Sequence, residues 1–222
     1  MANVDISPNE IESRFETGLL NLWYPVLPSW ALSDQPLGIT RLSQNIALWR
    51  DKDGTVHAIE DRCPHRGARL SLGWNLGDRL ACWYHGIEIN GNGKVESVPA
   101  IENCSMEGQH TTRSYPVKEV KDAIFLYFGD EAHAEPPELE FPEQLASEEF
   151  GHRLCTATWK CNYRYAVDNV MDPMHGAYLH AQSHSMAFGD KTAKMRVRDT
   201  NAGLVFEKVG QRDVNFDWVE IG

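Results

Sequence analysis

The chain of 222 residues contains no run of about 18 apolar residues, the length that a membrane-spanning helix requires. Its first ten residues are polar and include no apolar core of the kind found in secretory signal peptides. Both absences argue against a helical membrane protein and against a secreted one. We therefore expect a cytoplasmic protein that has no membrane partner.

Positive charge is also scarce, with 21 Lys and Arg against 32 Asp and Glu and a net charge of −11. The phosphate backbone of nucleic acids repels such a chain, so the composition predicts no nucleic-acid partner. Four arginines nevertheless lie close together in the sequence: Arg62, Arg66, Arg69 and Arg79. They form either ordinary loop and surface contacts or a local basic patch that binds an acidic protein.

Cysteine is rare as well, with five in the whole chain. This number does not suggest a disulfide framework and fits a reducing compartment. Cys104, Cys155 and Cys161 belong to no motif, and we expect them to be small buried thiols.

The two remaining cysteines each stand next to a histidine. One residue separates Cys63 from His65, and two residues separate Cys82 from His85. Two thiolates and two imidazoles can hold a two-iron, two-sulfur cluster, with the cysteines on one iron and the histidines on the other. A structural zinc site uses the same residue types, but its ligands usually begin with two cysteines two to four residues apart. Four unrelated buried residues are the third interpretation, and the spacing favours the cluster.

A glycine follows each of these pairs, Gly67 after the first and Gly86 after the second. Two loop tips must converge on one small cluster, and glycine permits the tight backbone paths that a Cβ atom would obstruct. Pro64 stiffens the first loop.

A second motif runs from Asp168 to His180 and contains His175. Two histidines and a carboxylate on one triangular face bind mononuclear Fe(II) and leave positions open for O₂ and substrate. On a straight α-helix, however, five residues turn through about 500°, so the rings of His175 and His180 would diverge by roughly 140°. They converge only if the helix is widened or broken, as in a π-bulge, which Pro173 and Gly176 would tolerate. The other interpretation is an amphipathic helix with two ordinary histidines.

The two Cys-His loops resemble the cluster-binding loops of Rieske proteins. High-potential Rieske proteins carry an extra, disulfide-bonded cysteine in each loop, where this chain has Ala68 and Tyr84. The resemblance therefore points to the lower-potential type found in ferredoxins and in ring-hydroxylating oxygenases.

The second motif, Asn169-x-x-Asp172-x-x-His175-x4-His180, resembles the iron site of Rieske oxygenase α subunits. The resemblance implies that His175 and His180 ligate the iron and that Asn169 lies near it. It also implies that Asp172 bridges His175 to His85 of an adjacent chain, a role for which the spacing of Asp168 fits less well. The third ligand of the family is a carboxylate far downstream, and four candidates lie too early in the chain for that role: Asp190, Asp199, Asp213 and Asp217. We therefore expect the chain to be a portion of a longer polypeptide.

The resemblance and the local patterns together predict an α+β protein. A β-rich Rieske [2Fe-2S] domain is expected at residues 25–130, after an N-terminal helix in residues 1–24. A linker rich in Pro and Glu is expected at 131–149, and the start of a helix-grip antiparallel-sheet catalytic domain at 150–222. The first helix should span residues 9–22, between Asn9 and Pro25, and a second helix should span 160–180. Strands are expected at 45–50, 55–61, 78–83, 87–90, 94–98, 115–120, 123–128, 152–159, 194–199 and 203–208.

By the same resemblance the expected function is that of a terminal oxygenase. It would use O₂ to hydroxylate, dihydroxylate or demethylate an aromatic or related organic substrate. Because the chain has no glycine-rich nucleotide fingerprint, electrons should come from a separate reductase, with or without a ferredoxin. A homotrimer or a higher multiple is expected, with or without a small β subunit. Two other classes stay open: a Rieske-type electron carrier without catalytic iron, and a regulatory protein with structural zinc.

Overall fold

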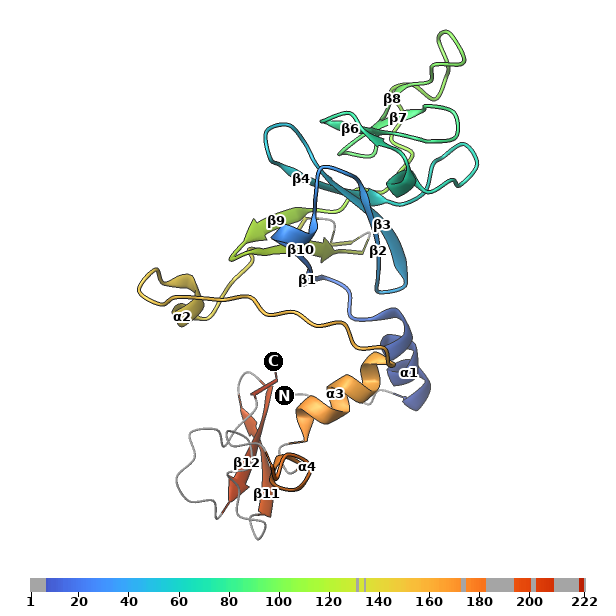
Figure 1. Ribbon diagram of the computed structural model, residues 1–222. Helices are drawn as coiled ribbons and strands as arrows, with labels where there is room; N and C mark the ends of the chain where they lie inside the picture. The colour runs from blue at the N-terminus through green and yellow to red at the C-terminus, as the bar shows by residue number, and fades with distance from the viewer. Residues whose placement is uncertain are drawn as a thin grey trace. The chain divides into compact units, whose positions relative to one another are not determined.

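The computed structural model describes residues 7–221 except 131, 134, 173–174, 183–193, 201–202 and 210–219. The chain divides into two compact units, Met1–Thr156 and Ala157–Gly222, each of which is described by itself (Figure 1). No helix among the described residues is long and apolar enough to cross a bilayer.

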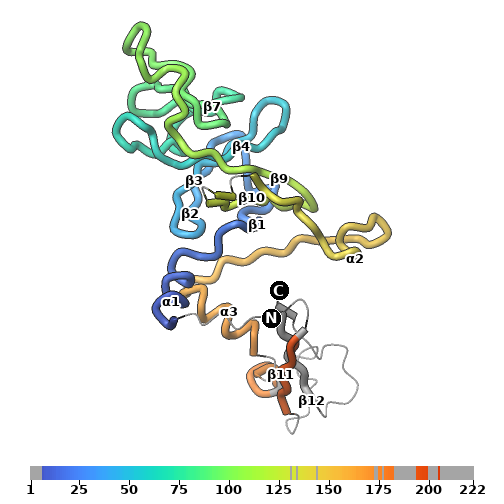
Figure 2. Tube along the Cα trace, turned by 180° about the vertical axis from the view of Figure 1, so that it is seen from behind, coloured from blue at the N-terminus to red at the C-terminus, as the bar shows by residue number. Residues whose placement is uncertain are grey.

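The first unit is built from three antiparallel sheets (Figure 1). Their strand orders are β1-β10-β9, β2-β3-β4 and β5-β6-β7-β8. The strands are β1 (Leu22–Pro28), β2 (Leu37–Arg41), β3 (Gln44–Arg50), β4 (Val56–Glu60), β5 (Trp74–Asn75), β6 (Arg79–Ala81), β7 (Glu88–Asn90), β8 (Val95–Ser97), β9 (Val117–Val120) and β10 (Ala123–Phe128). Seen from behind, the segment after β8 runs from the far end of its sheet back to β9 (Figure 2).

Strand β3 contributes to both cores of this unit. Ile46 and Leu48 belong to one core, with residues of β1, β4 and β10, whereas Ala47 and Trp49 belong to the other, with residues of β6, β7 and β8. Successive side chains of a strand point to opposite faces, so a strand buried on both faces consists of an uninterrupted apolar run. This burial explains why residues 46–49 are all apolar.

The arrangement of the sheets brings the two cysteines of the first motif into one core. Cys63 follows β4 and Cys82 follows β6, and both side chains belong to the core that contains Trp49. The indole nitrogen of Trp49 donates a buried hydrogen bond of 2.8 Å to the carbonyl oxygen of Gly77 in the β5–β6 turn. The loops that carry the cysteines therefore start from two sheets that pack on each other.

The predicted N-terminal helix exists but is wrong at both ends. Helix α1 spans Pro8–Thr17, and the Ser7 hydroxyl, rather than Asn9, accepts the capping hydrogen bond from the amide of Glu10. Pro25 lies inside strand β1, opposite Phe125. Proline is tolerated there because β1 is an edge strand of its sheet.

Most predicted hairpins are confirmed, but the strand predicted at residues 152–159 is wrong. These residues form no strand and no β-bridge to any other segment among the described residues. Strand β2 was not predicted. A short helix, α2 (Glu143–Ala146), lies within the predicted linker, and two 3-10 turns, η1 (Ser29–Ala31) and η2 (Leu70–Leu72), occur in the first unit.

The second unit contains α3 (Tyr163–Met171), α4 (Gly176–Leu179) and an antiparallel sheet of order β11-β12-β13. Its strands are β11 (Lys194–Thr200), β12 (Gly203–Val209) and β13 (Glu220–Ile221). The single helix predicted at 160–180 is thus two helices. A β-rich first part followed by helices and an antiparallel sheet confirms the predicted α+β class.

Candidate cluster and iron sites

The two Cys-His loops have the same backbone hydrogen bonds. In the first loop the amide of Gly67 donates to the Cys63 carbonyl, and the amide of Cys63 donates to the Ala68 carbonyl, both over 2.8 Å. In the second loop the amide of Gly86 donates to the Cys82 carbonyl, and the amide of Cys82 donates to the Ile87 carbonyl, both over 2.8 Å. Each loop is therefore a turn that two backbone hydrogen bonds close.

The glycines are required for their backbone conformation and not for space. Gly67 has φ +71° and Gly86 has φ +72°, values that L-residues with a Cβ atom rarely adopt. A Cβ atom on Gly67 would lie 3.5 Å from the Arg62 side chain, and one on Gly86 would lie 3.6 Å from Pro99. These are ordinary contacts, so the expectation that a Cβ would obstruct the path is wrong, and the positive φ is the reason for glycine.

The two cysteine side chains lie together inside the core, where Cys63 is 2% and Cys82 1% exposed. Burial raises the pKa of the Cys63 thiol to about 11, and the Cys82 thiol beside it acts in the same direction. Backbone amides of His65 and Arg66 point at the Cys63 sulfur and act in the opposite direction. A thiolate at this position therefore requires a metal to displace the proton, and two backbone donors are already in place for it.

The two histidines of the first motif meet at the exposed tips of the loops. The Nδ1 atoms of His65 and His85 are 3.2 Å apart, and their ring centroids are 4.8 Å apart. The observed separation of the two nitrogens is close to the roughly 3.4 Å that separates two nitrogen ligands when each lies about 2.1 Å from one tetrahedral metal. The Tyr84 ring packs against the His85 ring with centroids 3.9 Å apart, which limits the orientations of this imidazole.

The four side chains are thus arranged as a buried cysteine pair and an exposed histidine pair. Within the described part of the chain no three or more His, Cys, Asp or Glu side chains converge on a single point. This arrangement fits a cluster of two irons, each held by one pair.

The histidines of the second motif come together because they lie at the two ends of one helical turn. Helix α3 ends at Met171, His175 is the N-cap of α4, and His180 is its C-cap with φ −99° and ψ 23°. Their ring centroids are 5.2 Å apart. On a straight helix the two rings would diverge, but because the helix ends before His175 and a new turn begins there, they can approach each other. The described residues contain no π-helix, so the break is not a π-bulge within them.

Asp172 orients one of these rings. Nδ1 of His175 hydrogen-bonds to the backbone carbonyl of Asp172, and the Asp172 carboxylate lies 3.9 Å from the same nitrogen. A proton fixed on Nδ1 leaves the lone pair of Nε2 for a metal, as is usual for metal-ligating histidines. Asn169 is exposed on α3, and its carbonyl accepts a hydrogen bond of 3.4 Å from the Asp172 amide.

Of the four downstream aspartates considered as a third iron ligand, the structure describes one. Asp199 lies on β11, while Asp190, Asp213 and Asp217 lie outside the described residues. The expectation of buried thiols outside the motifs is wrong: Cys155 and Cys161 are exposed, and Cys104 is half-buried.

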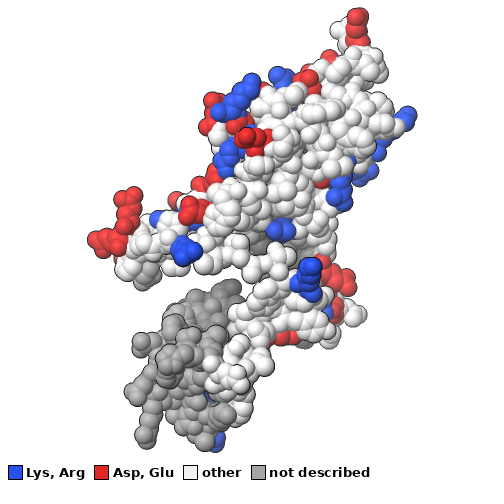
Figure 3. All heavy atoms as spheres, in the orientation of Figure 1, with Lys and Arg blue, Asp and Glu red and all other residues white. Residues whose placement is uncertain are grey.

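The four arginines around the first motif divide into two kinds. Arg79 makes ion pairs with Asp78 at 3.3 Å and Glu88 at 3.4 Å. Arg62, Arg66 and Arg69 are exposed, and in the described part of the chain their side chains make no ion pair. On the face that Figure 3 shows, basic and acidic side chains both occur, with uncharged surface between them.

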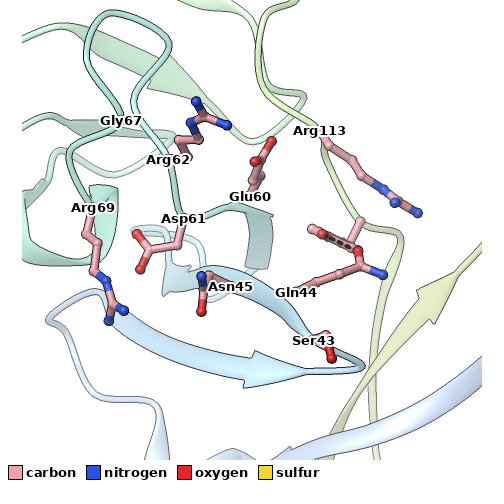
Figure 4. Close-up of a pocket in the computed structure, with 10 residues that line it drawn as sticks. Ser43, Gln44, Asn45, Glu60, Asp61, Arg62, Gly67, Arg69 and Arg113 are labelled. Carbon is pink, nitrogen blue, oxygen red and sulfur yellow. Dashed lines mark hydrogen bonds between the residues drawn. The ribbon is translucent and has the colours of Figure 1, made fainter. Parts of the chain in front are cut away.

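Two of these arginines line an open pocket beside the first cluster loop (Figure 4). Its volume is about 500 Å³, and its charged lining residues are Glu60, Asp61, Arg62, Arg69 and Arg113. Arg113 donates to the Gly129 carbonyl over 2.6 Å and stacks on the Tyr115 ring. Arg62 and Arg69 are therefore the cations of this pocket that remain available to a partner.

Comparison with known proteins finds a match for the segment around each motif. Residues 22–118 match the Rieske [2Fe-2S] domain, and residues 159–221 match the vanillate O-demethylase oxygenase C-terminal domain. The chain thus carries a Rieske [2Fe-2S] domain followed by a segment of oxygenase C-terminal type, and its relatives are Rieske oxygenase α subunits. The family match indicates two cofactors, a [2Fe-2S] cluster and a mononuclear iron.

Three related proteins show how far the Rieske oxygenase likeness extends. The vanillate O-demethylase oxygenase subunit of Pseudomonas sp. (strain HR199 / DSM 7063) is 35% identical, over 73% of this chain and 45% of that protein. Dicamba monooxygenase with non-heme iron and dicamba superposes with a TM-score of 0.64 at 29% identity, over 86% of this chain and 54% of the other. The oxygenase of carbazole 1,9a-dioxygenase, solved in complex with ferredoxin, superposes with a TM-score of 0.68 at 26% identity, over 100% of this chain and 64% of the other. The chain spans about half the length of the curated relatives it matches.

Sequence reasoning missed two polar residues beside the first cluster loop. Asp61 is only 4% exposed, and both of its carboxylate oxygens accept hydrogen bonds from Ser71. In the sequence Asp61 was only the last residue of a predicted strand. A charged residue at the end of an apolar strand, directly before a metal-binding loop, was the available signal.

Proposed function

We propose that this chain is the part of a terminal oxygenase that carries its Rieske cluster and two ligands of its catalytic iron. The observation that carries the proposal is the presence on one chain of two separate ligand sets, each already converged. The Nδ1 atoms of His65 and His85 are 3.2 Å apart, and the rings of His175 and His180 are 5.2 Å apart. When bound, the cluster supplies single electrons, and the mononuclear iron provides the place where O₂ reacts.

We assign the ligands as the sequence suggests. Cys63 and Cys82 hold one iron of the cluster, and His65 and His85 hold the other. His175 and His180 would hold the mononuclear iron, His175 through Nε2, with a carboxylate as the third ligand. Asp172 supports this role because its carbonyl oxygen fixes the His175 proton on Nδ1. Its side chain, at the end of α3, also remains the proposed bridge to His85 of an adjacent subunit, with Asn169 near the iron.

The substrate that we propose is an aromatic acid or a related aromatic compound, and the reaction is a monooxygenation that removes a methyl group. The match of residues 159–221 to the C-terminal domain of vanillate O-demethylase supports this choice, as does the likeness to dicamba monooxygenase. In such a reaction one oxygen atom of O₂ is inserted into a C–H bond of the methyl group, and the other leaves as water with two electrons from the reductase and two protons from solvent. The methyl carbon leaves as formaldehyde.

Replacing His175 with Ala tests the oxygenase proposal in the full-length protein with its reductase. We expect the visible and electron paramagnetic resonance spectra of the cluster to persist, while substrate-dependent O₂ uptake and formaldehyde release fall at least 100-fold. His152→Ala is the matched control, because His152 is exposed and its hydrogen bond to Asp122 lies on the surface of the first unit. Turnover that survives His175→Ala would refute His175 as an iron ligand, and a wild-type protein with a reducible cluster but no substrate-dependent O₂ uptake would support an electron carrier instead. A colourless wild-type protein that binds zinc would end the cluster assignment.

The proposed electron donor is a reductase, with or without a ferredoxin, that binds beside the first cluster loop. Arg62, Arg66 and Arg69 are exposed cations on a chain of net charge −11, so an acidic donor would be attracted to this region and repelled elsewhere. The solved complex of a related oxygenase with ferredoxin supports a separate protein as donor.

The proposed assembly is a homotrimer or a higher multiple, with or without a small β subunit, in the cytoplasm. Exposure of His65 and His85 supports it, because the histidine edge of the cluster is accessible to a neighbouring subunit. A fully active monomer in sedimentation velocity would contradict the assembly. The compartment is supported by the ligand thiolates, which need reducing surroundings until the cluster forms.

A further inference from the structure

Asp61 is a buried carboxylate next to the first cluster loop. It follows β4 directly and stands two residues before Cys63, so its Cα lies within about 7 Å of that ligand's Cα. The residue is 4% exposed. Its backbone amide donates to the Asn45 carbonyl over 2.9 Å, which holds the residue on β3.

Both carboxylate oxygens of Asp61 accept hydrogen bonds from one residue of η2. The Ser71 amide donates to Oδ1 over 2.7 Å, and the Ser71 hydroxyl donates to Oδ2 over 2.6 Å. The backbone of β2 covers this contact, because a Cβ atom on Gly38 would lie 2.6 Å from the hydroxyl and 3.1 Å from Oδ2. The carboxylate is thus held in one place and shielded from water on that side.

The Asp61–Ser71 contact joins the bases of both cluster loops. Directly after η2, Gly73 approaches β6 so closely that a Cβ atom would lie 2.0 Å from the Ala81 carbonyl. Ala81 is the last residue of β6 and precedes Cys82. A displacement of Ser71 would therefore be transmitted to the second loop as well as the first.

A purely structural tie does not explain the charge. An asparagine at this position could accept from the Ser71 amide and donate to its hydroxyl, with the same shape and no cost of burying an ion. Arg62 and Arg69 line the same pocket, but within the described residues neither forms an ion pair with Asp61 (Figure 4). Within the described residues the negative charge of Asp61, two residues along the chain from the cluster ligand Cys63, is therefore stabilised by the hydrogen bonds from Ser71.

We propose that Asp61 is a positioning residue whose fixed negative charge lowers the reduction potential of the cluster held by Cys63, His65, Cys82 and His85. Adding an electron to the cluster places more negative charge near a carboxylate that water screens poorly, which disfavours the reduced state. The inference rests on the proposed cluster and adds to it the group that sets its potential.

Redox titration of the cluster-loaded protein, followed by visible circular dichroism and electron paramagnetic resonance, tests the proposal. Asp61→Asn keeps the shape and both contacts to Ser71, so we expect an intact Rieske spectrum and a higher midpoint potential. Asp53→Asn is the matched control: it removes one carboxylate at the exposed hairpin turn at the far end of β4 and should leave the potential unchanged.

A second variant separates charge from geometry. Ser71→Ala removes one donor but keeps the Asp61 charge, so its potential should stay the same or fall. An unchanged potential in Asp61→Asn would overturn the proposal and leave Asp61 as a structural tie. If the Asp61→Asn variant does not assemble a cluster, the Ser71→Ala variant becomes the test. A raised midpoint potential in Ser71→Ala would then overturn the proposal. A wild-type protein without a Rieske spectrum would instead refute the cluster assignment itself.

Discussion

At the scale of single residues, backbone conformation and crowding are two separate reasons for glycine in this chain. Gly54, Gly67 and Gly93 have φ of +88°, +71° and +77°. A Cβ atom on Gly54 would meet nothing within 4 Å, and one on Gly67 would make an ordinary contact. On Gly93 it would lie 1.8 Å from the Thr112 carbonyl oxygen. A Cβ atom at Gly54 or Gly67 would therefore cost stability only through the strained backbone conformation, whereas one at Gly93 would add a collision with the backbone.

Replacing each of these glycines with Ala should rank them by free energy of unfolding. Gly54→Ala and Gly67→Ala should each lose about 1 kcal/mol, the cost of a left-handed conformation. Gly93→Ala should lose on the order of 3 kcal/mol or more, because a backbone carbonyl must move. Urea titration measures the ranking, and iron content per chain should fall only for Gly67→Ala of the first two. Equal losses at all three positions would contradict the distinction.

At the scale of elements, Asn21 and Asp130 join the entry to β1 with the exit from β10. Nδ2 of Asn21 donates to Asp130 Oδ2 over 2.9 Å, and the Asp130 amide donates to Asn21 Oδ1 over 2.9 Å. The hydrogen bond from Asn21, followed by that from His133, lowers the pKa of the Asp130 carboxyl from its ordinary 3.8 to about 2. The fold therefore favours the ionised carboxylate.

Acid should remove this contribution within a defined interval of pH. A lowered pKa in the fold means that the contribution is fully present above about pH 3.8 and is lost as pH falls through about 2. Asp130→Asn cannot ionise, so its deficit in stability relative to the wild type should shrink over this interval. Urea midpoints measured at successive pH values provide the comparison. A deficit that stays constant from neutral pH to about pH 2 would exclude the linkage.

At the scale of the whole molecule, the proposed electron donor would have to approach a chain whose net charge is −11. The exposed arginines beside the first loop provide local attraction, and Arg69 lines the pocket there together with Arg62. The acidic lining residues of this pocket reduce that attraction but do not reverse it, because three arginines face Glu60 and Asp61. Donor binding should therefore depend on salt and on these particular cations.

Replacing Arg69 with Glu should raise the donor KM roughly three- to tenfold at low ionic strength. The difference should nearly vanish in high salt, where the Debye length is shorter than the spacing of surface charges. Arg153→Glu makes the same charge change at an exposed position outside the pocket and should have little effect. If KM at low salt is the same for Arg69→Glu and the wild type, the donor binds elsewhere.

Comparison of particular elements shows where sequence reasoning succeeded. The hairpin of β3 and β4 was predicted because its apolar runs and its Asp-Gly turn are local, and backbone pairing across a short turn needs no distant partner. Strand β1 was not predicted, and its first residue, Leu22, was placed at the end of the helix because it fits a helical spacing with Leu19. Its pairing with β10, about 100 residues later, overrides that local pattern.

The sequence by itself determined which residues can hold iron, because ligand chemistry depends on residue type and on spacing within a short loop. Only the tertiary structure decided how those residues meet. It separated the cysteines and histidines into a buried and an exposed pair, and it broke the helix so that His175 and His180 converge. It also placed Ser71 against Asp61, through packing between segments whose contact no local pattern encodes.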